Sequence, residues 1–365
     1  MISIRTTLSA LVLLSCTSYA DTIHKTDGTS IEDCTIVLET LEEVTYKASG
    51  NKKERSVPSD EVLKVEFEKR PAEIDRALEA IREGQLLAAV SDLTLYLEGI
   101  KAGKSERRKW ASPVAIDLLI QQFKTMGEAD EVLIYCAKMI DEQADSRYVP
   151  MAYLTRAQTL FEKGEASKAK KVIENFVEVI DSKGLSKRWQ LECDLGVILY
   201  DPELTGEKRR DKLVIVSSNA GSKYPTVRNR ADVAEAQSLL KGSKFADAEV
   251  IFQRISTSTN SDVATRAAAF TGLGDCLFQK ASGMTEGSDE AKATLKAALM
   301  SYLRVTINYK NQTGYVAKSL FYAARCFDLM GGDAADNAQK LYRRVRRNFP
   351  GSQWAKESTS FLKKR

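Results

Sequence analysis

The sequence is poor in the residues that most enzymes and metal proteins depend on. Its 365 residues include a single histidine, His24, and neither an H-E-x-x-H nor a G-x-S-x-G motif occurs. One histidine excludes a histidine-rich metal site, and no nucleophile has an evident base partner. We therefore predict that the protein is not an enzyme and requires no metal and no cofactor.

The sequence also has almost no excess of positive over negative charge. The chain has 54 Lys and Arg against 50 Asp and Glu, a net charge of +4, which is too small to require a nucleic-acid partner. With 43% apolar and 28% charged residues, the composition is that of a folded protein and excludes a disordered or collagen-like chain. We expect no nucleic acid among its partners.

No apolar run is long enough to cross a membrane, but the N-terminus carries an export pattern. Arg5 precedes the short apolar run Leu8–Ser15, which is far below the roughly 20 residues of a membrane-spanning helix. Ser18 and Ala20 place small residues at the positions that signal peptidase prefers. The pattern predicts a secretory signal peptide over 1–20 and an exported protein, periplasmic or associated with the cell envelope.

A second processing route starts from the cysteine in this segment. Leu13–Cys16 resembles a bacterial lipobox, whose cysteine is lipidated and becomes the new N-terminus. Cleavage after Ala20 and lipidation at Cys16 both remain open. The other cysteines lie far apart and form no C-x-x-C pair, so we expect buried apolar thiols rather than a disulfide scaffold. They are Cys34, Cys136, Cys193, Cys276 and Cys326.

Residues 21–68 have the pattern of a small β module. Apolar and polar residues alternate over Val44–Ala48, the period of a half-buried strand. Asp27-Gly28 and Gly50-Asn51 supply tight turns between short strands. Four or five strands in so short a segment resemble the small SH3-like or Sm-like barrels found at the N-terminus of some exported repeat proteins.

From Pro71 onward the apolar period becomes helical and the pattern repeats. Ile74, Ala77 and Ile81 fall on one helical face. Short turns that contain glycine recur at intervals of about 37–45 residues, which indicates an array of helical repeats.

Two segments carry the repeat pattern most clearly. The stretch Phe270-x-x-Leu-Gly-x-x-Leu277 matches the first helix of a tetratricopeptide unit. Ala338 and Tyr342, followed by Pro350, match the second helix and its terminator. Small residues at such positions let two helices approach closely, and aromatic side chains fill the space between hairpins.

On these motifs the chain resembles the tetratricopeptide-repeat superfamily over 71–350. The segment Tyr342–Ala355 is similar to repeats of bacterial periplasmic envelope proteins of the Tol-Pal-associated cell-division coordinator and outer-membrane assembly lipoprotein type. The resemblance implies a mainly α fold, an α-solenoid of about seven helix hairpins. It is preceded by the β module over 21–68 and followed by a basic capping helix over 351–365.

A solenoid implies a non-catalytic scaffold that binds another protein or a peptide on its concave face. Phe161 and Phe278 are the preferred anchors, because an aromatic side chain buried in an interface contributes strongly to binding. The residues expected to line that face belong to the first helix of each pair. They are Leu154, Gln158, Phe161, Val197, Tyr200, Phe278 and Phe327.

The basic C-terminus supports an alternative function. Arg343, Arg344, Arg346 and Arg347 follow one another closely and form a candidate electrostatic docking site. Clustered cations add about 1 kcal/mol each near an anionic membrane surface. With lipidation at Cys16, the protein would instead be a lipid-anchored envelope protein that docks on a membrane or a cell-wall polymer.

Overall fold

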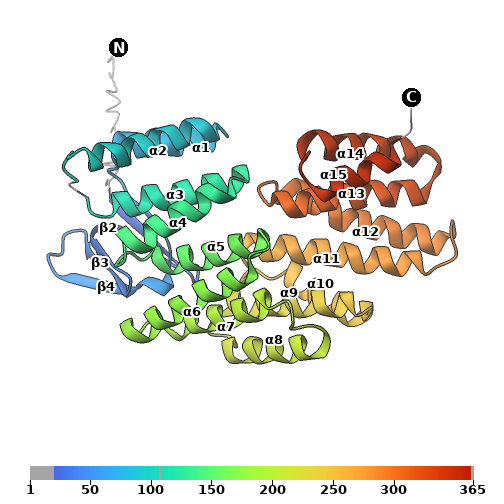
Figure 1. Ribbon diagram of the computed structural model, residues 1–365, viewed down its shortest axis with the longest axis horizontal. Helices are drawn as coiled ribbons and strands as arrows, with labels where there is room; N and C mark the ends of the chain where they lie inside the picture. Colours follow the sequence, from blue (N-terminus) through green and yellow to red (C-terminus); the bar gives the residue numbers. More distant parts are fainter. Residues whose placement is uncertain (1–19, 107, 363–365) are drawn as a thin grey trace, which may run out of the picture. The chain divides into compact units, whose positions relative to one another are not determined.

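The computed structural model describes residues 20–106 and 108–362. Within them the protein is mainly helical, with fifteen α-helices that follow a small five-stranded antiparallel sheet (Figure 1). The predicted change from strands to helices near Pro71 is therefore confirmed. Cys16, like all of the predicted signal peptide except Ala20, lies outside the described residues.

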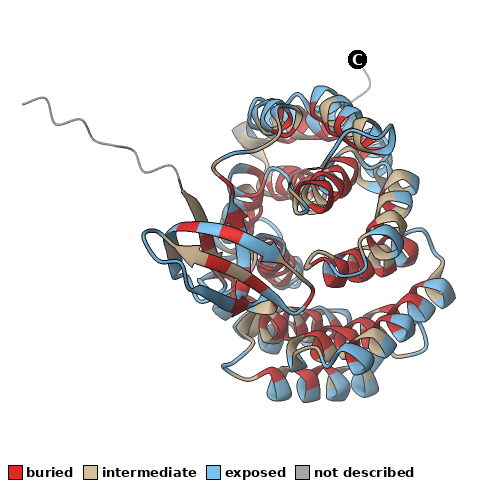
Figure 2. Ribbon diagram, turned by 90° about the vertical axis from the view of Figure 1, so that its left-hand side faces the viewer, coloured by how far each residue is buried: buried red, intermediate tan, exposed pale blue. Residues whose placement is uncertain are grey.

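The sheet occupies the N-terminal segment, in the order β4-β3-β2-β1-β5. A 3₁₀ turn, Ser59–Glu61, connects the two edge strands β4 and β5. Val57 of β4 and Val62 of β5 are both buried in one core, so the sheet curls around a common apolar centre (Figure 2). The strands are β1 Asp21–Lys25, β2 Ser30–Glu39, β3 Glu43–Ala48, β4 Glu54–Pro58 and β5 Val62–Glu66.

The helices follow with short connections. Several begin at a side-chain cap: Asp262 accepts the Thr265 N–H at 2.7 Å, and Ser288 accepts the Ala291 N–H at 3.2 Å. The helices are α1 Ala72–Arg82, α2 Leu86–Lys101, α3 Ala111–Met126, α4 Ala129–Glu142, α5 Val149–Glu162, α6 Ala166–Lys183, α7 Lys187–Tyr200, α8 Gly206–Ala220, α9 Pro225–Lys241, α10 Phe245–Ser256, α11 Val263–Ser282, α12 Asp289–Asn308, α13 Thr313–Met330, α14 Ala335–Asn348 and α15 Gln353–Phe361.

The chain forms two compact units. The first contains the described residues up to Ala115 together with Gln143–Tyr148, and the second contains the rest. In the first unit, the Phe67 ring at the end of the sheet stacks on Trp110, with ring centroids 3.5 Å apart. The Arg147 Nε donates to Oε1 of Glu39 in β2 at 2.5 Å. The sheet is thus packed against later residues of its own unit.

In the second unit, helices α4 to α15 contact their neighbours in the chain, and a second set of contacts joins alternate helices. Each odd-numbered helix from α5 to α15 also contacts the next odd-numbered helix. The even-numbered helices of the unit contact mainly the helices before and after them. The odd-numbered helices therefore form a continuous layer, which we call the odd-helix layer.

Glycine permits the closest approaches to α11. A Cβ placed on Gly272 would lie 2.3 Å from Cζ of Phe252, which comes from α10. A Cβ on Gly274 would lie 2.6 Å from Cε1 of Tyr302, which comes from α12. Both aromatic side chains are fully buried. Only glycine fits at these two positions without displacing a ring.

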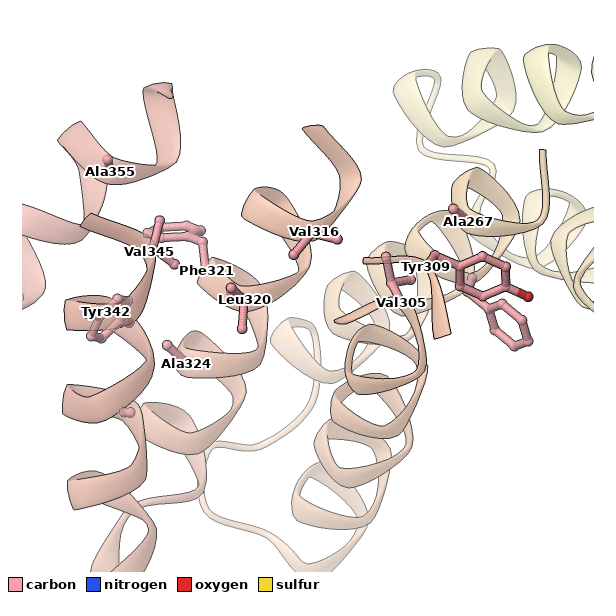
Figure 3. Close-up of a cluster of buried hydrophobic side chains, with 12 residues drawn as sticks. Ala267, Val305, Tyr309, Val316, Leu320, Phe321, Ala324, Tyr342, Val345 and Ala355 are labelled. Carbon is pink, nitrogen blue, oxygen red and sulfur yellow. The ribbon is translucent and has the colours of Figure 1, made fainter. Parts of the chain in front are cut away.

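The C-terminal helices share one core. Figure 3 shows Leu320 and Phe321 of α13 facing Tyr342 and Val345 of α14. Ala338, one turn before Tyr342, is fully buried, as expected of a position where two helices meet closely.

The five cysteines of the described chain lie in the cores, as predicted. All are buried and unpaired. Burial raises the pKa of the Cys136 and Cys326 thiols to about 12, so both stay protonated near neutral pH. No helix in the described ranges has the length and apolar character needed to span a membrane.

Candidate binding surface on the odd-numbered helices

The odd-helix layer carries a cavity of about 290 Å³, which we call the α11 pocket. Three successive odd-numbered helices contribute to it, α9, α11 and α13, together with the turn that leads into α10. A side chain bound in this pocket would therefore contact several helices at once. The lining residues are Leu240, Ser243, Phe245, Asp275, Phe278, Gln279, Lys318 and Tyr322.

Asp275 is the buried charge of the pocket. It is the one acidic residue in the otherwise apolar and small run Ala267–Phe278 of α11. The Tyr302 hydroxyl donates to its Oδ1 at 2.9 Å, and Nζ of Lys318 donates to its Oδ2 at 2.6 Å. Burial raises the pKa of Asp275 above its usual value, and the ammonium of Lys318 opposes that rise. The carboxylate is thus held by partners from α12 and α13.

The close approach at Gly274 makes this arrangement possible. The Tyr302 ring passes over Gly274, the residue before Asp275, and the ring is fully buried. Its hydroxyl then lies beside the carboxylate of Asp275. The glycine of the repeat pattern and the acid of the pocket are therefore parts of one structural feature.

Aromatic rings form the apolar wall. The Phe278 ring meets Tyr322 edge-on, with centroids 5.3 Å apart. Nζ of Lys318 lies 5.7 Å from the centroid of the same Tyr322 ring. The Lys318 side chain keeps 28% of its surface exposed, and Gln279 is exposed at the rim. The pocket thus offers an apolar wall beside a cation and an amide.

Polar and aromatic contacts join other odd-numbered helices in the same layer. The Phe161 ring of α5 lies 5.1 Å from the Tyr200 ring of α7. Glu192 of α7 forms an ion pair with Arg230 of α9, and Glu192 is almost completely buried. The carboxylate of Glu192 is the main reason that the pKa of Arg230 is raised. These contacts fix the spacing of α5, α7 and α9.

The residues predicted to line the concave face differ widely in exposure. Phe161 is 37% exposed, whereas Phe278 is only 7% exposed. Leu154 and Tyr200 are buried, and Gln158, Val197 and Phe327 are partly buried. Phe278 packs in the core cluster around Tyr302, with Phe327 against it, so Phe278 is a core residue with one side at the pocket. Contact of these residues with a partner stays a prediction.

Of the eight residues that line the pocket, only Phe278 was predicted from the sequence. Leu240 and Phe245 belong to the end of α9 and the start of α10, which the repeat pattern treats as a turn. Asp275 and Lys318 are far apart in the sequence and meet only through the packing of α11 on α13. One signal was available: a lone carboxylate, Asp275, within an apolar helical segment predicts a buried partner.

The four arginines of the candidate electrostatic site lie on α14. Arg343, Arg344, Arg346 and Arg347 are all exposed, while Tyr342 and Val345 bury the other side of the helix. Nε of Arg347 donates to the neighbouring Asn348 Oδ1 at 3.1 Å. The cations are therefore open to solvent, as the docking interpretation requires.

The single histidine, His24, contacts a hydroxyl and a carboxylate of the two neighbouring strands. It lies in β1, with Nδ1 3.1 Å from the Ser30 hydroxyl and Nε2 3.4 Å from a Glu66 carboxylate oxygen. No group of three or more His, Cys, Asp and Glu side chains in residues 20–106 and 108–362 is placed to hold a metal ion.

Comparison with known proteins adds no relative. No protein-family model matches the sequence, and no curated protein matches it significantly.

Proposed function

We propose that the protein is an exported scaffold of the tetratricopeptide type that binds an extended polypeptide along the odd-helix layer without turnover. The observation that carries the proposal is the contact of each odd-numbered helix with the next, from α5 to α15. In an α-solenoid, the first helices of successive hairpins line the concave surface in this way. In this proposal the fourteen helices α1 to α14 would form seven hairpins, with α15 as the capping helix.

The positions of small and aromatic residues support the tetratricopeptide assignment. Gly274 receives the Tyr302 ring and Gly272 receives Phe252, as the hairpin packing of such repeats requires. The sheet order and the 3₁₀ turn between β4 and β5 support an SH3-like barrel for the β module. The signal-peptide pattern of 1–20 supports export to the periplasm or the cell envelope.

The α11 pocket indicates the chemistry of the bound segment. The rings of Phe278 and Tyr322 favour an apolar side chain of the partner. Lys318 and Gln279 favour a backbone carbonyl or a carboxylate next to it, because both supply hydrogen-bond donors at the rim. An extended peptide with an apolar anchor supplies both groups.

Replacing Phe161 and Phe245 by Ala together is expected to weaken partner capture by at least about thirtyfold, since a single aromatic anchor already contributes about 2 kcal/mol. Phe161 lies on α5 of the odd-helix layer, and Phe245 lines the α11 pocket from the first residue of α10. Neither side chain is fully buried. Phe278→Ala is the poorer test, because this buried residue supports the core. The immobilised protein would be incubated with cell-envelope extract, and the captured proteins quantified by mass spectrometry.

The matched control is Val250→Ala, since Val250 is 70% exposed on α10, outside the odd-helix layer. It is expected to leave capture unchanged. Circular dichroism should show the same helical signal in all three proteins. Retention of every partner by the double variant would exclude the odd-helix layer as the binding surface.

A second candidate function rests on the exposed arginines of α14. Replacing Arg343, Arg344, Arg346 and Arg347 by Glu is expected to abolish binding to vesicles that contain anionic phospholipid, if the protein docks electrostatically. The binding of the unaltered protein should then fall steeply between low and physiological salt. Sedimentation with vesicles measures both effects. Equal binding by the two proteins would leave the arginines as a solvated helix face.

A further inference from the structure

Half of β2 has a strand neighbour on one side only. Residues Ser30–Cys34 pair with β1, whereas Cys34–Glu39 pair with β3. The pairing with β1 ends at Asp21, so among the described strands Thr35–Glu39 pairs with β3 alone. We call this half the β2 edge. It lines a cavity of about 560 Å³, which we call the β2 groove.

A side chain already replaces a missing strand at one end of this edge. Oδ2 of Asp21 accepts the Ile36 N–H at 2.8 Å, and Oδ1 accepts the Glu68 N–H at 2.9 Å. The Ile36 amide therefore points away from β3 and finds its acceptor in a carboxylate. A strand edge that presents such groups can pair with an added strand.

Apolar side chains are exposed along the same edge. Val37 and Leu38 are 44% and 43% exposed at a register shift in the pairing with β3. Both line the groove, as does Trp110, whose ring is stacked on Phe67. The groove can therefore hold apolar side chains of a bound segment as well as its backbone.

Glu39 is the second, independent feature that indicates a ligand. Only 4% of its side chain is exposed, and its Oε1 accepts a hydrogen bond from Nε of Arg147. The other oxygen, Oε2, is buried and has no hydrogen-bond partner. Nearly all buried polar atoms in proteins are paired. Glu39 is one of the residues that line the groove, so the unsatisfied acceptor belongs to the wall of the groove.

The charges around the groove favour an uncharged donor. Arg147 already balances the carboxylate of Glu39. The other charged residues of the lining are Asp21 and Glu68 against Lys69, Arg108 and Lys109, an excess of one positive charge that disfavours a further cation. A hydroxyl or amide side chain satisfies the acceptor without that repulsion.

We propose that the β2 edge binds an extended segment of a partner protein, which pairs with β2 as an added strand and places a hydroxyl or amide side chain against Glu39 Oε2. The partner segment is thus an extended one that carries apolar side chains for the groove and one hydroxyl or amide side chain for Glu39. This surface consists of residues of the first unit and shares none with the α11 pocket. A negative result at the β2 edge would therefore leave the proposed binding at the α11 pocket untouched, and the reverse also holds.

The test uses the full-length protein and a displayed library of random peptides of about twelve residues, long enough to cover the edge. The matched variants are Leu38→Lys in the groove and Leu63→Lys on β5, where Leu63 is 69% exposed and outside the groove. Selected peptides are expected to bind Leu38→Lys about tenfold or more weakly and Leu63→Lys with unchanged affinity.

Two readouts separate strand addition from simple apolar binding. Only every second amide of the peptide faces β2. Methylation of the amides that face β2 should therefore abolish binding, and methylation of the intervening amides should not affect it. Replacing the Thr that faces Glu39 by Val, which keeps the shape, should weaken binding as well. Hydrogen exchange should slow at Ile36–Glu39 when peptide is bound. Peptides that bind both variants alike, or tolerate methylation at every position, would overturn the proposal, as would a library that yields no binder.

Discussion

Replacing Gly274 by Leu is expected to lower the free energy of unfolding by about 3 kcal/mol, the upper end of the usual cost of overpacking a core. Even a Cβ atom at this position would lie 2.6 Å from the ring of Tyr302. That ring is fully buried and its hydroxyl is bonded to Asp275, so it has no free space to enter. Urea titration followed by circular dichroism measures the loss.

Gly314→Ala is the matched control for this prediction. Gly314 lies in the first turn of α13, and a Cβ there would meet no atom within 4 Å. Because Ala has the higher helix propensity, the change should leave stability equal or raise it by up to about 1 kcal/mol. Equal urea midpoints for Gly274→Leu and the unaltered protein would contradict the close packing of Tyr302 of α12 against Gly274 of α11.

Replacing Lys318 by Met is expected to cost about 3 kcal/mol at neutral pH, because it leaves Asp275 buried without its counter-charge. This expected cost is at the lower end of the range for a buried ion pair that loses one partner, since part of the Lys318 side chain is exposed to solvent. Met keeps an unbranched apolar side chain as far as Cε, so lost packing contributes little. Thermal and urea unfolding both measure the effect.

The cost of Lys318→Met should shrink on acidification. In the native protein the pKa of Asp275 already lies above its usual value of 3.8, because burial disfavours the carboxylate. Such a group binds its proton more tightly in the native than in the unfolded state, so its ionisation destabilises the fold as pH rises from about 4 through the native pKa. Removing Lys318 removes an influence that lowers the pKa, so the native pKa of Asp275 rises further.

At acidic pH, where Asp275 is neutral in the variant, the missing ammonium costs little. The double variant Asp275→Asn with Lys318→Met is the control, because it carries no charge at either position. It should recover part of the lost stability at neutral pH and show no such pH dependence. A cost of Lys318→Met that stays constant from about pH 7 to pH 4 would exclude the ion pair as its cause.

Secondary structure was predictable because the local period of apolar residues determines it. Alternation over Val44–Ala48 marks a strand that the structure contains as β3, and the helical period from Pro71 onward marks α1. Gly274 and Ala338 were recognisable as close contacts because the repeat pattern requires small residues there. The close contact at Gly274 is confirmed, and Ala338 is fully buried.

The candidate sites depend on contacts that no local pattern encodes. Asp275 and Lys318 meet because α13 packs on α11 in one particular register, and Glu39 meets Arg147 across 108 residues of sequence. Burial of Phe278 follows from the same packing, whereas its position in the repeat pattern only places it on the first helix of a pair. Sequence periodicity identifies the face of a helix, but the depth of each side chain depends on its neighbours.

Site-specific photo-crosslinking in cells tests the proposed binding along the odd-helix layer most directly. A photoreactive amino acid would replace Gln279, exposed at the rim of the α11 pocket, or Val250, exposed on α10. The account predicts a crosslinked partner from position 279 and none from position 250, with the adduct lost when Phe161 and Phe245 are replaced by Ala. Adducts of equal yield from both positions, or from position 250 alone, would contradict it.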